Sequence, residues 1–186
     1  QEGAFTGEIS PVMIKDAGCQ FVIIGHSERR QYFQETNESV NKKLKAALKQ
    51  GLTSIVCVGE TLNERENDKT FQVLDDHIHN SLKDIGEEDL LKIIIAYEPV
   101  WAIGTGKTAT ASQAQEAQKY IRDLLKKMYN IGAADKIRIQ YGGSVKPQNI
   151  IELLKEPDVD GALVGGASLE VGSFSEIVKK ASEVIK

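Results

Sequence analysis

Residues 92–110 read KIIIAYEPVWAIGTGKTAT, and this stretch decides the fold. The continuous apolar run that begins at Ile93 predicts a strand buried on both faces, as in a parallel sheet flanked by helices. Pro99 biases Glu98 toward an extended backbone and ends the strand. We therefore expect a carboxylate where a buried strand meets a loop, and this loop carries the only tryptophan of the chain.

The same pattern recurs along the chain, because four further apolar segments are each followed by polar or glycine-rich residues and then by a helix signal. The expected strands are residues 21–24, 53–58, 93–98, 137–140 and 162–164. The expected helices are residues 11–18, 36–50, 110–130 and 147–154, a long helix from Thr61 and a last helix capped by residues 173–176. Strict alternation of short buried strands and helices predicts an α/β fold with a parallel sheet. Its chemically interesting residues follow the strands, where such sheets place their active sites.

Composition narrows the class of protein further. The 186 residues are 41% hydrophobic and 27% charged with a net charge of −4, which favours one domain with a real core and shows no basic face for nucleic acid. The longest apolar runs fall short of the roughly 20 residues that span a membrane. We see no signal peptide at residues 1–3, and expect Cys19 and Cys57 to be buried free thiols of a cytoplasmic protein.

Two side chains at strand ends are candidate acid–base groups. Glu98 stands at the mouth of an apolar strand, where partial burial makes a carboxylate a stronger base, although an ordinary capping or pairing role fits its position equally well. His26 follows the strand at 21–24; a lone histidine there is more often structural, but His77 and His79 look like surface positions of a helix. The residues expected to form a supporting network beside His26 are Ser27, Glu28 and Arg29.

Two glycine pairs are candidate anion sites. Gly142-Gly143 and Gly165-Gly166 each end a strand and precede a helix, so that backbone N–H groups can approach an anion closely. A single glycine pair is a common turn. Pairs on two consecutive units match the phosphate site that barrels build after their last two strands.

Residues 104–108 admit two nucleotide-binding alternatives. Their ending resembles a Walker A loop, but the full pattern requires glycine at the position of Trp101. Gly104 and Gly106 also fit a loose dinucleotide fingerprint, yet they lie beyond Pro99 rather than in a tight strand-to-helix turn. The sequence therefore disfavours both, and it contains no cluster of Cys, His or carboxylates at metal-ligand spacing.

Four motifs, in this order, resemble the triosephosphate isomerase family. They are GHSERR at 25–30, AYEPVWAIGTG at 96–106, YGGS at 141–144 and LVGG at 163–166. The resemblance runs along the whole chain. It implies a TIM barrel that interconverts dihydroxyacetone phosphate and glyceraldehyde 3-phosphate in glycolysis and gluconeogenesis, with no cofactor and no metal.

The resemblance also implies roles for particular residues. Glu98 would be the base that moves a proton between adjacent carbons, and His26 a neutral electrophile. Residues 99–109 would be a lid that excludes water. The phosphate would be bound by Gly104, Ser144, Gly165 and Gly166. Supporting roles would fall to Ile103 and Leu163, which crowd Glu98; to Glu60, which holds Trp101 in the open lid; and to Tyr141 and Ser144, which hold the closed lid.

The chain departs from the family pattern at its start. Residues 1–186 would form a single partial TIM-barrel domain with five strand–helix units, N-terminally truncated by three strands. The family's Asn-x-Lys segment, whose lysine holds the phosphate, is not among these residues, and Asn41-Lys42-Lys43 cannot replace it because it lies in an expected helix. Loss of such a charge-stabilising group typically costs about 100-fold to 1,000-fold in rate or more.

Two hypotheses from different classes follow. One is an isomerase, either complete in the natural gene and truncated here, or working weakly as an assembly without the lysine. The other is a catalytically dead, self-assembling fragment that keeps a phosphate-binding pocket. Five parallel strands do not close a barrel, so the strands at 21–24 and 162–164 would be bare edges that associate with further copies or with an N-terminal piece.

Overall fold

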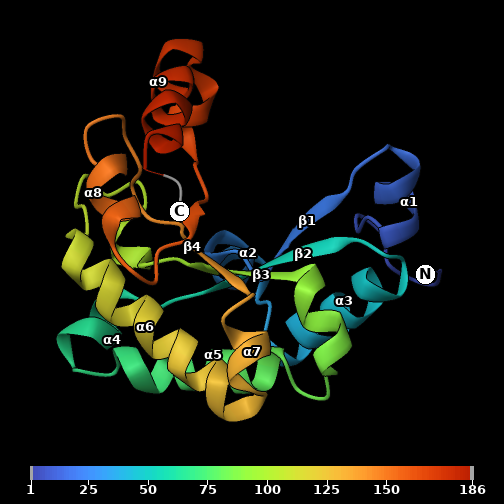
Figure 1. The fold of residues 1–186 in the computed structure, drawn as a ribbon. Coiled ribbons are helices and arrows are strands. Elements are labelled where there is room, and N and C mark those ends of the chain that lie inside the picture. Colours follow the sequence, from blue (N-terminus) through green and yellow to red (C-terminus); the bar gives the residue numbers. More distant parts are fainter. Residues whose placement is uncertain (1, 185–186) are drawn as a thin grey trace.

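The computed structural model describes residues 2–184, which form an α/β fold around one sheet of five parallel strands (Figure 1). Residues 1, 185 and 186 of the predicted 1–186 domain lie outside the described residues. The strands lie in the order of the chain: β1 (Phe21–Ile24), β2 (Thr53–Val58), β3 (Ile93–Tyr97), β4 (Arg138–Tyr141) and β5 (Gly161–Ala162). This order confirms the predicted parallel α/β fold. Over the described residues the sheet stays open, with β1 and β5 at its edges.

The strand register brings the candidate residues to one edge of the sheet. Val56 of β2 pairs with Ile24 of β1 on one side and with Ile95 of β3 on the other. The ladder between β3 and β4 ends with Tyr97 opposite Tyr141. Because all strands point the same way, the residues that follow β1, β2, β3 and β4 meet at the carboxyl edge.

The core lies between the sheet and three helices: α3 (Asn37–Lys49), α5 (Thr70–Ser81) and α6 (Ala111–Met128). Figure 1 shows these helices along one face of the sheet. Each presents a stripe of buried residues, for which Leu44, Ile78 and Ile121 stand as fully buried examples. Full burial of such a side chain contributes about 1.5–3 kcal/mol. All five residues of β3 are buried, as its apolar run predicts.

The remaining elements are short, apart from the last helix. They are α1 (Pro11–Asp16), α2 (Ser27–Phe33), α4 (Leu62–Glu66), α7 (Ile131–Ala134), α8 (Ile150–Lys155) and α9 (Val171–Ser182), with 3-10 turns η1 (Glu87–Lys92), η2 (Val100–Ala102) and η3 (Gly166–Leu169). In Figure 1, α9 (red) stands away from the sheet, and it contacts α8 and η3.

Several boundaries differ from the sequence prediction. The long helix expected from Thr61 is two helices, because Asp68 between α4 and α5 takes a left-handed backbone with φ of 57°. The last helix begins at Val171, and no side chain caps it, so the expected cap at residues 173–176 is wrong. Strand β5 ends at Ala162 rather than at residue 164. Helix α8 begins at Ile150, three residues after Pro147.

The two cysteines lie in different environments. Cys57 on β2 is buried as predicted, whereas Cys19 is exposed, which corrects the prediction for that residue. Cys19 lies in the connection before β1, at the open edge of the sheet, where Phe21 is also half exposed.

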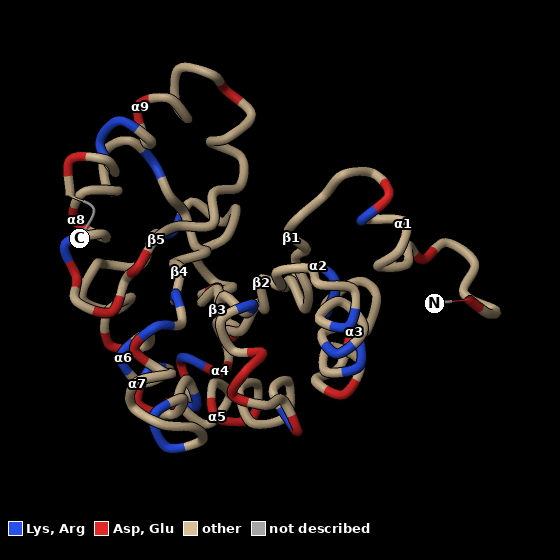
Figure 2. Tube along the Cα trace, turned by 45° about the vertical axis from the view of Figure 1, so that its right-hand side comes forward, with Lys and Arg blue, Asp and Glu red and all other residues tan. Residues whose placement is uncertain are grey.

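Positions of positively and negatively charged residues occur along the same helices, as the colours of Figure 2 show. Several pair one helical turn apart, for example Lys42 with Glu38 and Lys119 with Asp123. Such pairs are typical of solvated helix faces, where water and salt screen the attraction and the pairs add little to stability. None of the helices described in residues 2–184 has the length and apolar content of a membrane span.

Helix α6 begins with the predicted capping box. The Thr110 Oγ1 accepts the N–H of Gln113 at 3.1 Å, and the Gln113 Oε1 accepts the N–H of Thr110 at 3.0 Å. We expect Thr110→Ala to lower the free energy of unfolding by about 1 kcal/mol, because a helix N–H loses its acceptor. Urea unfolding measured by circular dichroism tests this. Thr108→Ala, two residues before the N-cap Thr110, is the control, and equal effects of the two substitutions would contradict the prediction.

Candidate active site

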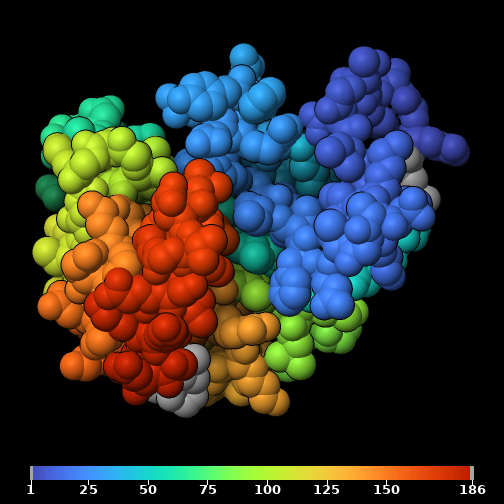
Figure 3. Space-filling view, turned by 90° about the horizontal axis from the view of Figure 1, so that it is seen from above, coloured from blue at the N-terminus to red at the C-terminus, as the bar shows by residue number. Residues whose placement is uncertain are grey.

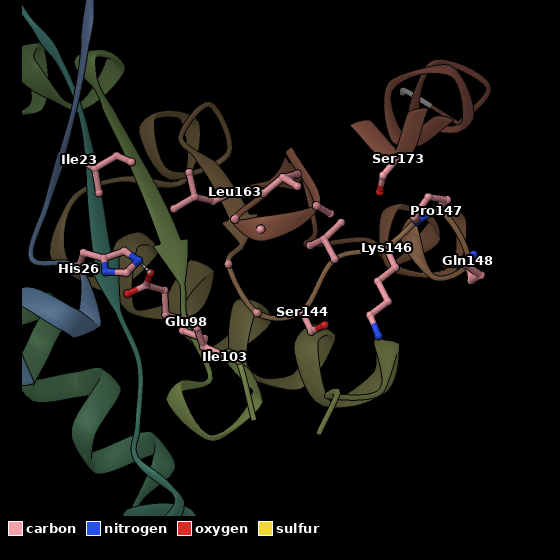
Figure 4. Close-up of a pocket in the computed structure, with 18 of the residues that line it drawn as sticks. Ile23, His26, Glu98, Ile103, Ser144, Lys146, Pro147, Gln148, Leu163 and Ser173 are labelled. Atoms are coloured by element: carbon pink, nitrogen blue, oxygen red, sulfur yellow. Dashed lines mark ion pairs between the residues drawn. The ribbon is translucent and has the colours of Figure 1, made fainter. Parts of the chain in front are cut away.

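A buried carboxylate and an imidazole meet at the carboxyl ends of β1 and β3. The Glu98 Oε1 lies 2.9 Å from the His26 Nε2, and Figure 4 shows the two side chains facing each other. The second oxygen, Oε2, accepts the backbone N–H of Ser27 at 2.9 Å. Glu98 is only 2% exposed, so both of its oxygens are held by protein groups rather than by bulk water.

Helix α2 sets the orientation of His26, which is its N-cap residue. The His26 Nδ1 accepts the backbone N–H of Glu28 at 3.3 Å, whereas the Glu28 side chain points to solvent. An Nδ1 that accepts a hydrogen bond carries no proton, so the neutral tautomer with its proton on Nε2 satisfies both contacts. The hydrogen bond to Glu98 raises the pKa of His26, and partial burial acts against this rise.

Backbone hydrogen bonds on both sides fix the position of Glu98. Its own N–H donates to the Val58 carbonyl at 2.8 Å, and the N–H of Val100 donates to the Glu60 carbonyl at 3.0 Å. Gly59, between these two acceptors, packs so closely that a Cβ there would lie 1.8 Å from the Glu98 carbonyl oxygen. The loop after β2 therefore supports the backbone of Glu98 through hydrogen bonds and close packing.

A cavity of about 760 Å³ opens in front of the pair. Figure 3 shows a hollow between the N-terminal blue residues and the C-terminal red ones, and Figure 4 shows the side chains that line the cavity. The predicted site residues that line it together with His26 and Glu98 are Ile103, Gly104, Ser144, Leu163, Gly165 and Gly166. These six residues come from the loops that follow β3, β4 and β5.

The two glycine pairs differ in their surroundings. A Cβ on Gly165 or Gly166 would meet no atom within 4 Å, so this turn is open to the cavity and an anion can reach it. In the other turn, the Gly142 N–H donates to the Tyr97 carbonyl at 2.7 Å, and a Cβ on Gly143 would lie 2.2 Å from the Tyr141 hydroxyl. There the glycines serve close packing.

The loop after Glu98 is anchored at its start and meets Ser144 and Tyr141 further along. The Ser144 N–H donates to the Ala102 carbonyl at 3.1 Å. Tyr141 is fully buried beneath this loop, and burial raises the pKa of its hydroxyl to about 12. Gly104 takes a left-handed backbone with φ of 67° and touches nothing at its Cβ position, which leaves the middle of the loop free of packing.

Glu60 is the anchor at the start of this loop. Its fully buried carboxylate accepts the Trp101 indole N–H at 2.8 Å and the Tyr97 hydroxyl at 3.1 Å. Arg65 adds an ion pair at 3.0 Å, and its guanidinium lies over the Trp101 ring. The structure thus contains the Glu60–Trp101 contact that the family resemblance implies for an open lid.

His77 was expected on the surface of a helix, and this prediction is wrong. His77 is partly buried, and its Nδ1 accepts the Gly59 N–H at 3.3 Å. The sequence does hold a signal for this position, since position 77 lies three residues from Leu74 and next to Ile78 on the buried stripe of α5. His79 lies on the exposed face, as expected, beside Asp75.

No group of three or more His, Cys, Asp or Glu side chains within residues 2–184 is arranged to hold a metal ion. The described site presents a carboxylate, an imidazole and backbone N–H groups to the cavity.

The fold is that of a partial TIM barrel, an open sheet of parallel strands with the candidate site residues at the carboxyl ends of the strands. The sequence profile described as "Triosephosphate isomerase" matches residues 1–181. The chain belongs to the triosephosphate isomerase family.

Curated relatives agree with this assignment. The chain is 62% identical over 178 residues to the triosephosphate isomerase of Geobacter metallireducens, an alignment that covers 96% of this chain and 71% of the relative. It is 60% identical to that of Endomicrobium trichonymphae, with the same two coverages. Identity to the protein of that name from Thermoanaerobacter sp. is 57%, over 96% of this chain and 72% of the relative.

Proposed function

We propose that the chain interconverts dihydroxyacetone phosphate and glyceraldehyde 3-phosphate by proton transfer through an enediolate. The observation that carries the proposal is the contact of 2.9 Å between the Glu98 carboxylate and the His26 imidazole, at the wall of a cavity that also holds the open Gly165-Gly166 turn. Membership of the triosephosphate isomerase family supports it. The proposed setting is glycolysis and gluconeogenesis in the cytoplasm.

Glu98 is the proposed base. A substrate carbonyl that enters beside His26 would accept the Nε2–H in place of Glu98, which frees Oε1 to take a proton from the adjacent carbon. The N–H of Ser27, at 2.9 Å from Oε2, would hold the carboxyl group while the proton is on it. Return of the proton to the neighbouring carbon would complete the isomerisation once the hydroxyl proton has moved from one substrate oxygen to the other, a transfer that the adjacent His26 Nε2 would assist.

His26 is the proposed electrophile. Its Nε2–H would donate to the substrate oxygen on which negative charge develops, and a neutral imidazole in this role is the established behaviour of the family. The Glu28 N–H at 3.3 Å from Nδ1 supports that role here, because protonation of Nδ1 would break this hydrogen bond.

The substrate phosphate is proposed to bind the turn at Gly165 and Gly166, with the N–H groups of Ser144 and Gly104 completing the site when the loop at 99–109 closes. In this structure the Ser144 N–H donates to Ala102, so closure would require that contact to be exchanged. Closure would also bring Ile103 and Leu163 over Glu98 and remove water from the base.

Proton abstraction is the step to measure, because it is detectable even when net turnover is slow. We expect the chain to catalyse incorporation of deuterium from D₂O into dihydroxyacetone phosphate, followed by NMR. For a polypeptide of these 186 residues alone, the rate is expected about 100-fold to 1,000-fold below that of a site that also holds the family's Asn-x-Lys lysine. A rate equal to that of buffer, with phosphate still bound, would contradict the proposal.

A second candidate function is a self-associating scaffold that binds phosphate without catalysis. The open sheet favours it, because Phe21 and Ile23 on the edge strand β1 are 50% and 47% exposed. An exposed apolar edge of this kind is a template for pairing with another chain. We propose that copies of the chain associate through the exposed edges, which applies to the isomerase as well.

Association predicts a particle larger than a monomer in light scattering at micromolar concentration. We expect Phe21→Asp to shift the distribution toward monomer, since a charge on the edge strand opposes pairing. Leu91→Asp is the matched control, because Leu91 is also exposed, at 62%, but lies in η1 outside the sheet. A monodisperse monomer for the unaltered chain would rule out the association.

A further inference from the structure

A second cavity, of about 490 Å³, lies behind the catalytic pair, and His77 is one of the residues that line it. It is lined by His77 from α5, by Arg30 from α2 and by Gly59 from the loop after β2. Glu98 lines both this cavity and the substrate cavity. A movement of residues near His77 can therefore reach Glu98 through a few contacts.

His77 contacts the support of Glu98 at Gly59. The carbonyl before it accepts the Glu98 N–H, the carbonyl after it accepts the Val100 N–H, and its own N–H donates to the His77 Nδ1 at 3.3 Å. Residues 58–60 thus hold the backbone on both sides of Glu98, and the middle residue is held by the imidazole.

The same segment carries the anchor of the loop. The carboxylate of Glu60 accepts the Trp101 indole N–H at 2.8 Å. The Gly59 N–H and the Val58 carbonyl belong to one peptide plane, so the contact with His77 holds the plane whose oxygen accepts the Glu98 N–H. Glu60, which contacts Trp101 and Val100, is the next residue along the chain. One hydrogen bond from Gly59 to His77 therefore steadies two features of the site.

The surroundings keep His77 neutral. Burial is the largest cause that lowers its pKa, the positive charge of Arg30 adds to this effect, and Asp76 and Glu64 act in the opposite direction. The resulting pKa is about 4. Three more titratable groups line the cavity: Glu35, Glu98 and Cys57, the last a thiol whose pKa is raised well above its usual range by burial.

We propose that His77 is a positioning residue for the isomerisation: its neutral imidazole accepts the Gly59 N–H and so fixes the segment that supports Glu98 and the Glu60–Trp101 contact. The proposal rests on the proposed function in one respect, namely that Glu98 is the base. The contacts themselves are independent of any substrate.

The test compares three variants in ¹⁵N-labelled protein. His77→Leu removes the acceptor, His77→Gln offers an amide oxygen in its place, and His79→Leu changes an exposed histidine of the same helix. Hydrogen exchange is measured at the Gly59 amide and at the Trp101 indole, which gives a single signal because the chain has one tryptophan. We expect His77→Leu to speed exchange at both sites about tenfold, the factor that one ordinary hydrogen bond contributes.

The His77→Gln variant distinguishes a positioning role from a packing role, because its side-chain amide oxygen can accept the Gly59 N–H in place of the imidazole. We expect His77→Gln to keep both exchange rates within about twofold of the original, and His79→Leu to leave them unchanged. A folded His77→Leu variant with unchanged exchange at both sites would overturn the proposal. So would a folded His77→Gln variant that behaves like His77→Leu.

Acid pH supplies an independent readout. Protonation of His77 removes the acceptor for Gly59 and places a cation beside Arg30, so the Gly59 and Trp101 signals should shift with a midpoint near pH 4. In His77→Gln this shared shift should be absent. Persistence of the same shift in His77→Gln would count against the proposal.

Kinetics distinguish failure of this inference from failure of the proposed function. If the chain turns over triose phosphate, His77→Leu should lower kcat about tenfold with KM within twofold, because groups that contact substrate are unchanged. Faster exchange at the Gly59 amide and at the Trp101 indole, with kcat unaltered, would overturn the positioning role alone. If the unaltered chain shows no turnover, the proposed function fails, and the exchange rates still decide whether His77 holds the segment.

Discussion

Glu98→Gln is expected to lower the rate of deuterium incorporation into dihydroxyacetone phosphate by about 100-fold to 10,000-fold. The amide is nearly isosteric with the carboxylate and can still accept the Ser27 N–H, but it cannot take a proton from carbon. The fold should be retained, so circular dichroism and the urea midpoint should stay close to those of the unaltered chain.

Glu98→Asp is the matched variant, because it keeps the charge and shortens the side chain by one methylene. We expect its rate of deuterium incorporation to lie between those of the unaltered chain and the glutamine variant, since displacement of a catalytic group by about 1 Å costs roughly 100-fold in rate. Equal rates for Glu98→Gln and the unaltered chain, with both folded, would exclude Glu98 as the base.

Gly59→Ala is expected to destabilise the chain by about 3 kcal/mol or more. The new methyl group would lie 1.8 Å from the Glu98 carbonyl oxygen and 2.5 Å from its carbonyl carbon. Both are backbone atoms of a segment tied by hydrogen bonds, so they cannot move aside as a side chain would. Overpacking in tight sites typically costs about 1–3 kcal/mol, and a clash with backbone lies at the upper end of that range or beyond it.

Gly172→Ala is the control for this substitution. Gly172 lies in the first turn of α9, and a Cβ there meets nothing within 4 Å. Alanine at such a helix position should be neutral or stabilising by up to about 1 kcal/mol. Urea unfolding of both variants gives the comparison, and similar midpoints for the two would show that the loop after β2 is not rigid.

The parallel sheet and the meeting of Glu98 with His26 are predictable from sequence for one physical reason. A buried apolar run is local information, and the shared direction of parallel strands brings residues after different strands to a common edge. The glycines at 165 and 166 follow from the same rule. These positions need no knowledge of side-chain packing.

Other features depend on tertiary contacts that no local pattern contains. Helix α2 has no apolar stripe, since Tyr32 and Phe33 are 68% and 64% exposed, and it is fixed at its start by the His26 cap. The break between α4 and α5 rests on one left-handed residue, Asp68. The burial of His77 depends on where α5 packs against the end of β2, which its sequence spacing only suggests.

The unequal burial of the two cysteines makes the chain chemically addressable at one place. Cys57 is enclosed in the sheet, and burial raises the pKa of its thiol well above the usual range, which suppresses the reactive thiolate. Cys19 is exposed, two positions before the edge strand β1. A maleimide fluorophore would attach there in native protein without any engineered residue. Its anisotropy and energy transfer between labelled copies would then report, in real time, whether that edge is occupied.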